Sequence, residues 1–300
     1  MRAFKELDIS AATDIAVRGM EFDYWNEALI REKTFGSLDF DPELSIAVDG
    51  DGVLAGFAQG AVGVVAEGKL RGYVRLLMVS PAARRKGIGS QLLTEMEKRL
   101  KSKGVELVSI MDSPLNYFTP GVDFRYTAAY CFLLKHKYET YRENHNLRCE
   151  LHPDMWPDLD TQVAAFQQDG FWLRRALSSD REATFKFLDT AWPSWKHEVG
   201  GSLDNDPCTL YIAGNGDEVI AFSGYQGNNK ALPWFGPMGT STELRGKGIG
   251  AILLRLCLRD MARQGWQYSI IPWVGPVAFY ARFCDAKIDR CFWAYRKELG

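Results

Sequence analysis

The sequence has 300 residues, of which 46% are hydrophobic and 25% are charged, with a formal net charge of −2. This is the composition of a globular protein, and a prior of roughly 150 residues per domain predicts two domains. The near-neutral charge gives no sign of a nucleic-acid partner. No segment approaches the roughly 18 uncharged apolar residues that cross a bilayer, so we expect no membrane partner either.

The N-terminal stretch MRAFKELDIS lacks an apolar segment followed by a small-residue cleavage site. It therefore predicts no signal peptide and a cytoplasmic location. The six cysteines form no CxxC pair, and we expect them to be free and mostly buried thiols. The four histidines show no metal-ligand spacing, so we expect no metal site. The cysteines are Cys131, Cys149, Cys208, Cys257, Cys284 and Cys291.

The first half of the chain opens with the short strand RAFKEL and a helix from Ala11. A hairpin follows, because Asp49–Gly52 separates two runs of β-forming residues. The strand Val74–Val79 then leads through a Gly-rich stretch into an amphipathic helix that ends at Gly104. The strand Val105–Met111 comes next.

The second half repeats this order. The strand FWLRRAL begins at Phe171, a helix starts near Asp180, and Gly214–Asp217 marks a hairpin turn. The strand LPWFGPM, a helix that ends at Gly265 and the strand WQYSIIPW follow. Each half reads β-α-α-β-β-β-α-β-α-β. We expect an α/β (α+β) protein with two similar domains, each a mixed, mostly antiparallel twisted sheet flanked by helices.

The boundary between the halves is predicted from composition. HPDMWPDLD is rich in Pro and Asp, as linkers tend to be, and TQVAAFQQDG fits one short connecting helix. We expect an N-terminal domain at 1–151, a linker with a short helix at 152–170, and a C-terminal domain at 171–300.

A ten-residue signature occurs twice, as RRKGIGSQLL from Arg84 and as RGKGIGAILL from Arg245. In each copy a strand, a basic Gly-rich loop and a helix N-terminus come together. Free backbone N–H groups and the helix dipole make such a place an anion site, and glycines allow close approach of phosphate oxygens. The signature lacks the GK[ST] ending of a P-loop and the third glycine of a dinucleotide fingerprint.

The pattern R-x-x-G-x-G at the start of a long helix resembles the acetyl-CoA pyrophosphate loop of the GNAT family of acetyltransferases. One copy alone would equally fit a basic helix start with a Gly turn; two copies in matching element orders favour the resemblance over nearly the whole chain. Tandem members of the family exist, and mycothiol synthase has this architecture. The resemblance implies acetyl-CoA as acyl donor, bound by Arg84, Arg85, Lys86, Gly87, Ile88, Gly89 and Ser90, and by Arg245, Gly246, Lys247, Gly248, Ile249, Gly250 and Ala251.

In the GNAT family the thioester carbonyl is held by a backbone N–H of the strand before the loop, where that strand bulges. The resemblance places this role on Met78 and Val79 in the first half. In the second half the matching residues are Met238, Gly239 and Thr240. Pro and Gly in WFGPMGT favour a bulge in that strand, because both interrupt ladder pairing.

The family's general acid is commonly a Tyr in the pattern N-x-x-A-x-x-F-Y. The second half reads WVGPVAFY, which puts Tyr280 at the acid position, with Trp273 in place of the Asn and Pro276 in place of the Ala. The first half has Leu133 there, which cannot donate a proton. The alternative for Tyr280 is an aromatic core residue, and in the first half a different acid, among Tyr117, Tyr126 and Tyr130, stays open.

The strand before the second loop carries no carboxylate, so the base is sought elsewhere. Glu198 is the candidate, with His197, Asp189 or an ordered water as alternatives, and for each side chain a solvated surface position remains open. Trp192, Trp195, Trp234 and Trp273 are candidates for the wall of an acceptor site, or for core residues.

Together these patterns predict an acetyl-CoA-dependent N-acetyltransferase that acts on a primary amine of a small molecule, with catalysis in the C-terminal half. No Cys or Ser sits in a recognisable activated triad, so we expect direct transfer without a covalent enzyme intermediate. We expect a monomer or homodimer. Two alternatives stay open: a non-catalytic acyl-CoA sensor, and a Fem-type transferase that uses aminoacyl-tRNA and needs a basic surface.

Overall fold

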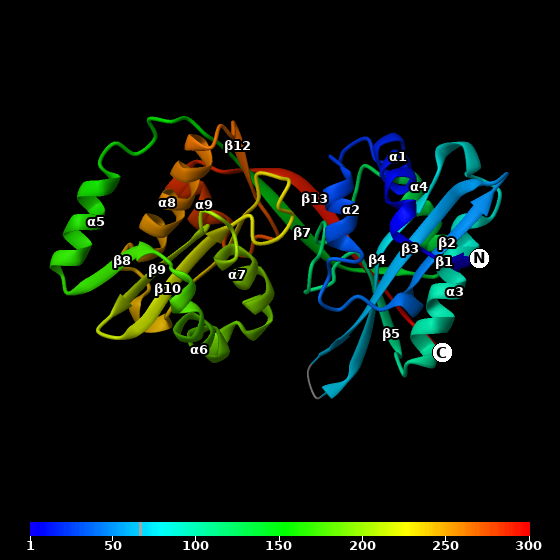
Figure 1. The fold of residues 1–300 in the computed structure, drawn as a ribbon, viewed down its shortest axis with the longest axis horizontal. Coiled ribbons are helices and arrows are strands. Elements are labelled where there is room, and N and C mark those ends of the chain that lie inside the picture. Colours follow the sequence, from blue (N-terminus) through cyan, green and yellow to red (C-terminus); the bar gives the residue numbers. More distant parts are fainter. Residues whose placement is uncertain (66–67) are drawn as a thin grey trace. The chain divides into compact units, whose positions relative to one another are not determined.

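The computed structural model describes residues 1–65 and 68–300. It divides into two compact units. Unit 1 consists of Met1–Asn144 and Cys291–Gly300, and unit 2 consists of His145–Arg290. Each unit contains a twisted sheet flanked by helices, as Figure 1 shows. The α/β fold class and the tandem arrangement predicted from the sequence are confirmed.

The elements of unit 1 follow the predicted order. Its helices are α1 (Ile9–Gly19), α2 (Glu27–Lys33), α3 (Ile88–Ser102) and α4 (Thr127–Lys135). Its strands are β1 (Arg2–Ala3), β2 (Ser45–Gly50), β3 (Val53–Val64), β4 (Leu70–Val79), β5 (Leu107–Ile110) and β6 (Val122–Asp123), with parts of β7 (Glu139–Glu150) and β13 (Lys287–Glu298).

The sheet of unit 1 has the order β1-β2-β3-β4-β5-β13-β7. All pairs from β1 to β4 are antiparallel, and β4 and β5 are parallel. Helix α3 packs on one face because Leu92, Leu93, Met96 and Leu100 recur at helical spacing and are fully buried. The predicted hairpin is confirmed, with its turn between β2 and β3.

The elements of unit 2 repeat those of unit 1 after an extra helix. The helices are α5 (Leu159–Gln168), α6 (Arg181–Ala191), α7 (Lys196–Leu203), α8 (Ile249–Arg263) and α9 (Val277–Cys284). The strands are β8 (Phe171–Arg175), β9 (Leu210–Asn215), β10 (Glu218–Tyr225), β11 (Phe235–Thr240) and β12 (Tyr268–Ile271). Helix α5 lies in the segment where the sequence predicts a connecting helix, and it belongs to unit 2.

The sheet of unit 2 runs β8-β9-β10-β11, all antiparallel, and its two faces carry separate cores. Helices α8 and α9 contribute to one core, with Leu253, Leu254 and Cys284 buried. Helices α6 and α7 contribute to the other, with Leu188 and Val199 buried. The first is the core on the α8 side, and the second is the core on the α6 side.

The two halves of the sequence exchange the ends of their last strands. In unit 2 the end of β7, Leu147–Glu150, pairs antiparallel with β12. In unit 1 the end of β13, Tyr295–Glu298, pairs antiparallel with β5. The compact units therefore differ in composition from the linear division 1–151, 152–170 and 171–300. That division describes the duplicated sequence and stays a prediction.

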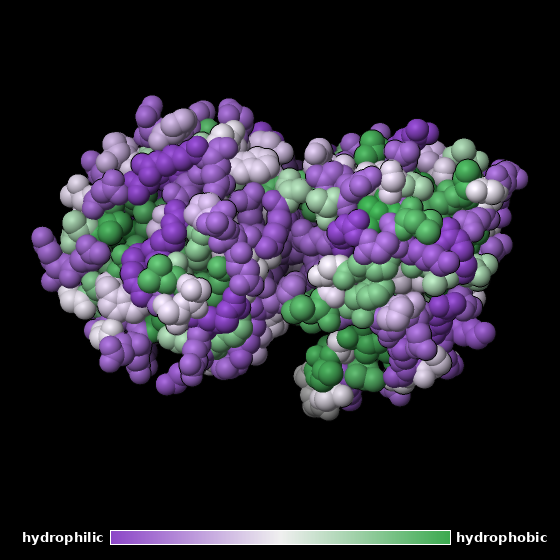
Figure 2. Space-filling model, in the orientation of Figure 1, coloured by the Kyte–Doolittle hydropathy of each residue, from purple (hydrophilic) through white to green (hydrophobic). Residues whose placement is uncertain are grey.

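The hairpin of β3 and β4 ends in exposed apolar residues. Val64 is 73% exposed and Leu70 is 37% exposed, and Figure 2 shows hydrophobic side chains gathered at this hairpin end. Among the described residues, no helix is both long enough and apolar enough to cross a membrane.

Candidate active site

The two copies of the signature adopt the same backbone conformation. In unit 1 a 3-10 turn, Pro81–Ala83, follows β4, and in unit 2 Thr242–Leu244 follows β11. The helix N-caps are Gly87, with φ 85° and ψ −6°, and Gly248, with φ 85° and ψ −8°. Arg84 and Arg245, three residues earlier, are both extended, with φ −64° and −62°. The repeated sequence therefore encodes a repeated loop.

Both loops leave room for an anion. A Cβ on Gly246 or Gly248 would meet no atom within 4 Å in the described structure, and one on Gly87 would meet only the Gln91 side chain, at 3.9 Å. These glycines have φ near +85°, which side chains disfavour. The first N–H groups of α3 and α8 have no acceptor inside the helix and lie beside this space. The residues present fit the diphosphate of a coenzyme A.

The basic side chains of the two loops differ in what they contact. Arg84 donates to the carbonyl oxygens of Val79, at 3.3 Å, and Gly19, at 3.0 Å, so it braces its loop. Arg85, Lys86, Arg245 and Lys247 are exposed, and the Lys247 ammonium lies 5.5 Å from the centre of the Phe171 ring. These four cations surround the two loops.

The remaining predicted loop residues form the first turns of the two helices. Ile88, Gly89 and Ser90 begin α3; Ile249, Gly250 and Ala251 begin α8. The side chains of Ile249 and Ala251 are buried and anchor α8 in the core.

Ser90 Oγ lies 2.9 Å from His136 Nε2, and burial lowers the pKa of His136, which favours the neutral imidazole.

In unit 1, β4 and β5 diverge just before the loop. They pair only through Arg71–Val74, so no strand of the described structure faces the rest of β4 on that side. Ser80 N donates to Ala55 O on β3, which marks a bonded pair, and bonded pairs alternate along an antiparallel ladder. The amide of Met78 therefore points to β3, while those of Leu77 and Val79 point into the gap. Leu77 was not among the residues predicted from sequence.

The same geometry recurs in unit 2. Strands β11 and β12 approach only at one parallel bridge, Trp234 to Ile270. Ser241 N donates to Ile220 O, so the amide of Gly239 points to β10. The amides of Met238 and Thr240 then point into the gap. Two N–H groups in line along an open strand edge are suited to hold a thioester carbonyl and an adjacent amide.

Both strands bulge at the same place. In β4 the register shifts between Leu76 and Val74, which leaves Arg75 unpaired. In β11 the shift falls at Gly236 and Pro237, as the sequence predicted. Arg75 lies two residues before Leu77, and Gly236 lies two residues before Met238. Arg75 and Gly236 are therefore equivalent, because the amides of Leu77 and Met238 both point into the gap.

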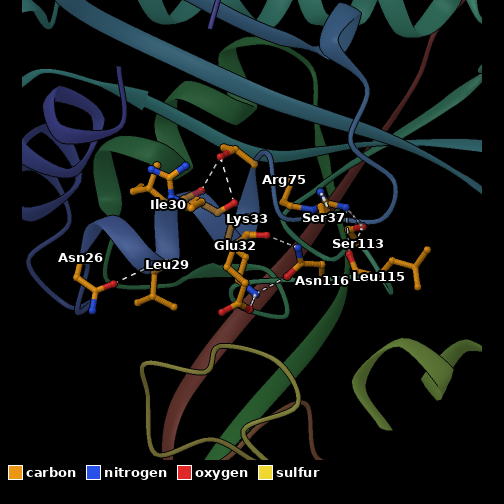
Figure 3. Close-up of polar contacts among 12 residues, drawn as sticks. Asn26, Leu29, Ile30, Glu32, Lys33, Ser37, Arg75, Ser113, Leu115 and Asn116 are labelled. Atoms are coloured by element: carbon orange, nitrogen blue, oxygen red, sulfur yellow. Dashed lines mark hydrogen bonds and ion pairs between the residues drawn. The ribbon is translucent and has the colours of Figure 1, made fainter. Parts of the chain in front are cut away.

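The surroundings of the two bulges are opposite. Arg75 is fully buried and donates to Ser37 Oγ at 3.1 Å, Asp39 Oδ2 at 2.6 Å and Leu115 O at 3.1 Å. Figure 3 shows it among Ser37, Ser113 and Leu115. A Cβ on Gly236 would meet nothing within 4 Å in the described structure. The bulge of unit 1 is filled by the chain itself, and that of unit 2 is open.

A second buried cation, Lys33, also bonds to the segment that follows β5 in unit 1. Lys33, at the end of α2, donates to Asn116 Oδ1 at 2.6 Å, and Asn116 Nδ2 donates to the carbonyl oxygen of Glu32 at 2.6 Å (Figure 3). The segment after β5 is thereby fixed to α2. Two of its aromatic side chains, Tyr117 and Phe118, are buried, so it is not an ordinary surface loop.

Helices α4 and α9 stand at equivalent places. The Phe132 ring of α4 lies 3.4 Å from where a Cβ on Gly89 would be, and the Phe279 ring of α9 lies 3.6 Å from the same point on Gly250. The next residues, Leu133 and Tyr280, are therefore equivalent, and both are buried. The contrast between Leu133 and Tyr280, found by comparing the two halves of the sequence, therefore concerns equivalent positions in the fold.

Tyr280 lies beside the bulged strand. Its ring is 6.2 Å from that of Phe235, the residue before Gly236, in an edge-to-face arrangement. Burial raises the pKa of the Tyr280 hydroxyl well above its ordinary value, so the phenol stays protonated at neutral pH. Tyr280 is therefore a buried, protonated hydroxyl donor in the core on the α8 side of the sheet.

Two of the alternative tyrosines of unit 1 have identifiable neighbours. Tyr126 donates to Asp23 Oδ2 at 2.7 Å and accepts from Phe22 N at 3.1 Å, so it closes the loop between α1 and α2. The Tyr130 ring packs 5.4 Å from that of Trp293. These contacts give both side chains structural roles.

The predicted base lies on the opposite face of the sheet from Tyr280. Glu198 is on α7 and is 6% exposed, so the solvated surface position considered for it is excluded. Asp189 is exposed and pairs with Lys196 at 2.6 Å. Since α7 lies on the α6 side and α9 on the α8 side, Glu198 and Tyr280 flank the sheet that ends in β11. In the part of the chain described, no cluster of three metal-ligating side chains occurs.

A splayed pair of strands, a bulge and a Gly-rich loop at a helix N-terminus define an acyltransferase fold, present here twice. Consistent with this, the sequence matches the acetyltransferase (GNAT) family over residues 11–116 and 171–284. The chain belongs to this family and is by class an acyltransferase. A comparison with curated proteins gives no match.

Solved structures with the same fold cover the whole chain. One is the GCN5-related glucosamine N-acetyltransferase region of a fungal multi-domain GH3 β-N-acetylglucosaminidase, with a TM-score of 0.79 at 20% identity; it aligns with 99% of this chain and 38% of that one. A GCN5-related N-acetyltransferase from Sphaerobacter thermophilus has a TM-score of 0.68 at 18% identity, covering 99% and 94%. A tandem GNAT protein of the clavulanic acid pathway has 0.64 at 16%, covering 100% and 97%. These likenesses establish the tandem fold.

Proposed function

We propose that unit 2 is the catalytic unit and transfers an acetyl group from acetyl-CoA directly to a primary amine of a small molecule. The observation that carries the proposal is the contrast between the two bulges. Catalysis needs space for an amine beside the thioester. Gly236 leaves that space, whereas Arg75 and its partners fill it in unit 1.

Acetyl-CoA supplies the activated acyl group as a thioester. The loop from Arg245 to Gly248 and the first turn of α8 hold its phosphates through backbone N–H groups. The amide of Met238 donates to the thioester carbonyl oxygen, and that of Thr240 to the adjoining pantetheine. Such donors stabilise negative charge that grows on the oxygen during attack, because they are fixed in position beforehand.

Two side chains move protons. Tyr280 donates its phenolic proton to the leaving thiolate, and because burial raises the pKa of this hydroxyl it stays protonated through the neutral range. Glu198 accepts the proton of the amine, directly or through a water molecule. The two groups come from opposite faces of the sheet, which suits an acid and a base that act on opposite ends of the reacting group.

Unit 1 is proposed to bind acyl-CoA without turnover. The N-cap glycine of its helix has nearly the same dihedral angles as that of unit 2, and Leu77 and Val79 offer the same pair of amides. It lacks the acid, because Leu133 replaces Tyr280. An amino sugar is the first acceptor class to test for unit 2, since one neighbour of the same fold is a glucosamine N-acetyltransferase region.

The test uses three glycine-to-glutamate variants. Gly248→Glu and Gly87→Glu each place a carboxylate and backbone strain in one loop. Gly170→Glu is the matched control, because Gly170 also has a φ of +86° and open surroundings but is not at a helix N-terminus. Thiol release from acetyl-CoA with a panel of amines is measured beside calorimetric binding of acetyl-CoA.

Loss of turnover in Gly248→Glu alone supports the proposal. Loss in Gly87→Glu alone would move catalysis to unit 1. Binding of acetyl-CoA without thiol release for any amine would favour the sensor instead. The control Gly170→Glu is expected to keep wild-type turnover and binding.

A further inference from the structure

We infer that the Trp192 side chain sets the length of the acyl group that unit 2 accepts and restricts it to acetyl. This inference rests on the proposed function, namely that acyl-CoA binds along β11. Its basis is the position of the indole, which lies against the backbone of β11 between the two amides that point into the gap.

The Trp192 ring occupies the face of β11 that lacks a side chain. Its Cη2 and Cζ3 atoms lie 3.0 Å from where a Cβ on Gly239 would be. A side chain at position 239 would therefore be crowded by this ring and by Phe222, whose Cε1 lies 2.9 Å from the same point. Gly239 stands between Met238 and Thr240, so the indole covers the strand at the level of the thioester.

The ring is held on several sides. It stacks on Trp195 with a centroid distance of 5.6 Å and an interplanar angle of 2°. It meets Phe222 edge-on at 6.0 Å and 73°, and Phe187 at 5.7 Å. Its backbone N–H donates to Leu188 O at 2.7 Å, which fixes it to the end of α6. An aromatic ring with this many neighbours does not rotate away at low cost.

The direction of the acyl chain follows from the placement of the loop. The phosphates lie at the N-terminus of α8, next to Thr240, so the pantetheine runs along the strand edge from Thr240 towards Met238. The side chains of these two residues occupy the α8 side, each with an atom 3.4 Å from where a Cβ on Gly250 would be. The α8 side of the strand is thus occupied by side chains. On the other face, an acyl chain longer than acetyl meets the Trp192 indole.

The experiment compares the binding of acetyl-CoA, butyryl-CoA and hexanoyl-CoA by calorimetry. All proteins carry Gly87→Glu, so that only the loop of unit 2 is measured. Trp192→Ala is expected to raise the affinity for butyryl-CoA relative to acetyl-CoA by about tenfold, because each buried methylene contributes ~0.8 kcal/mol and butyryl has two more. Wild-type Trp192 is expected to bind acetyl-CoA at least as well as the longer esters.

Trp172→Ala is the matched control. Trp172 lies over Gly214 just as Trp192 lies over Gly239, and both border the core on the α6 side. However, it belongs to β8, at the other edge of the sheet from β11. Its removal makes a similar loss of packing and is expected to leave the affinity ratio unchanged.

An unchanged ratio in Trp192→Ala, or an equal rise in Trp172→Ala, would overturn the inference. If Trp192→Ala does not fold, Trp192→Leu is used. This variant is expected to show a smaller rise in the affinity for butyryl-CoA relative to acetyl-CoA, and the absence of a rise would contradict the inference. Gly248→Glu distinguishes a failure of the proposed binding site from a failure of the role inferred for Trp192. Retained acetyl-CoA binding in that variant would refute the proposed site itself, whereas lost binding with an unchanged ratio in Trp192→Ala refutes only the role of the tryptophan.

Discussion

Arg75 and Gly236 occupy the same position in the bulged strands of the two units, and only Arg75 fills the space beside its strand. Its guanidinium bonds Asp39 and the carbonyl oxygen of Leu115, so it joins the segment after α2 to the segment after β5. The equivalent bulge therefore has a different role in each unit. In unit 1 it seats a structural cation, and in unit 2 it leaves the strand edge open.

Replacing Arg75 by Met is expected to destabilise unit 1 by about 3–5 kcal/mol, because it leaves the partly buried Asp39 carboxylate and the Leu115 carbonyl oxygen without their donor. Turnover of acetyl-CoA by the folded protein should stay within about twofold of wild type, since Arg75 lies outside unit 2. Denaturant unfolding and thiol release at 25 °C are the measurements.

Arg99→Met is the control for the Arg75 variant. Arg99 pairs with Glu95 on the surface of α3 at 2.8 Å and is 31% exposed, so its loss should cost less than about 1 kcal/mol. A fall in turnover of Arg75→Met with stability intact would contradict the assignment of catalysis to unit 2.

Tyr280→Phe removes the proposed acid and keeps the ring packed against Phe235. We expect kcat to fall by about 10- to 1000-fold, because general acids contribute at this level, while the affinity for acetyl-CoA stays near wild type. Because burial raises the pKa of Tyr280, wild-type kcat should show no fall through loss of this acid as pH rises to about 10. Steady-state kinetics against pH and calorimetry provide the comparison.

Tyr138→Phe is the matched variant in unit 1. Tyr138 is also buried and donates to Glu97 at 2.9 Å, so its loss is expected to lower stability slightly and leave kcat unchanged. Equal kcat for Tyr280→Phe and wild type would show that Tyr280 is only a core residue.

Local patterns in the sequence were sufficient for the loops and the order of elements. Gly87 and Gly248 adopt positive φ because the turn requires it, and the apolar spacing after each fixes a helix. The exchange of β7 and β13 was not predictable, since strand partners depend on contacts between residues far apart in the chain. The burial of Arg75 was missed for the same reason, because its partners are 36 to 40 residues away.

The directions of the strand amides also required the structure. Sequence comparison named Met78 and Gly239 with their neighbours, but which amides face the gap depends on the pairing register. A register fixed by Ser80 and Ser241 turns the alternate amides outward and adds Leu77 to the candidates. Glu198 was assigned without knowledge of its burial, because α7 is short and its apolar pattern does not show which face is covered.

One duplicated ion pair escaped the sequence comparison because the two copies are short and differ in sequence. Arg2 donates through two nitrogens to Asp8, at 2.7 and 2.8 Å, and Lys5 N donates to the same carboxylate at 2.8 Å. In unit 2, Arg174 and Leu177 N make the corresponding bonds to Asp180. In both places the pair joins the first strand to the turn that starts the first helix.

Asp8→Asn should destabilise unit 1 by about 2 kcal/mol at pH 7, since it weakens a charge-assisted pair on a buried carboxylate.

The hydrogen bonds from Arg2 hold the pKa of Asp8 below its usual value. A lowered folded-state pKa means that the pair stabilises the protein above the unfolded-state pKa of about 3.9 and loses this effect as pH falls through the folded-state value. The difference in Tm between wild type and Asp8→Asn should therefore be several degrees at pH 7 and shrink below about pH 4. Asp154→Asn, at an exposed position in unit 2, should show no difference at either pH. Thermal unfolding of the three proteins between pH 3 and pH 7 provides the measurement, and a difference between wild type and Asp8→Asn that grew on acidification would contradict the assigned ion pair.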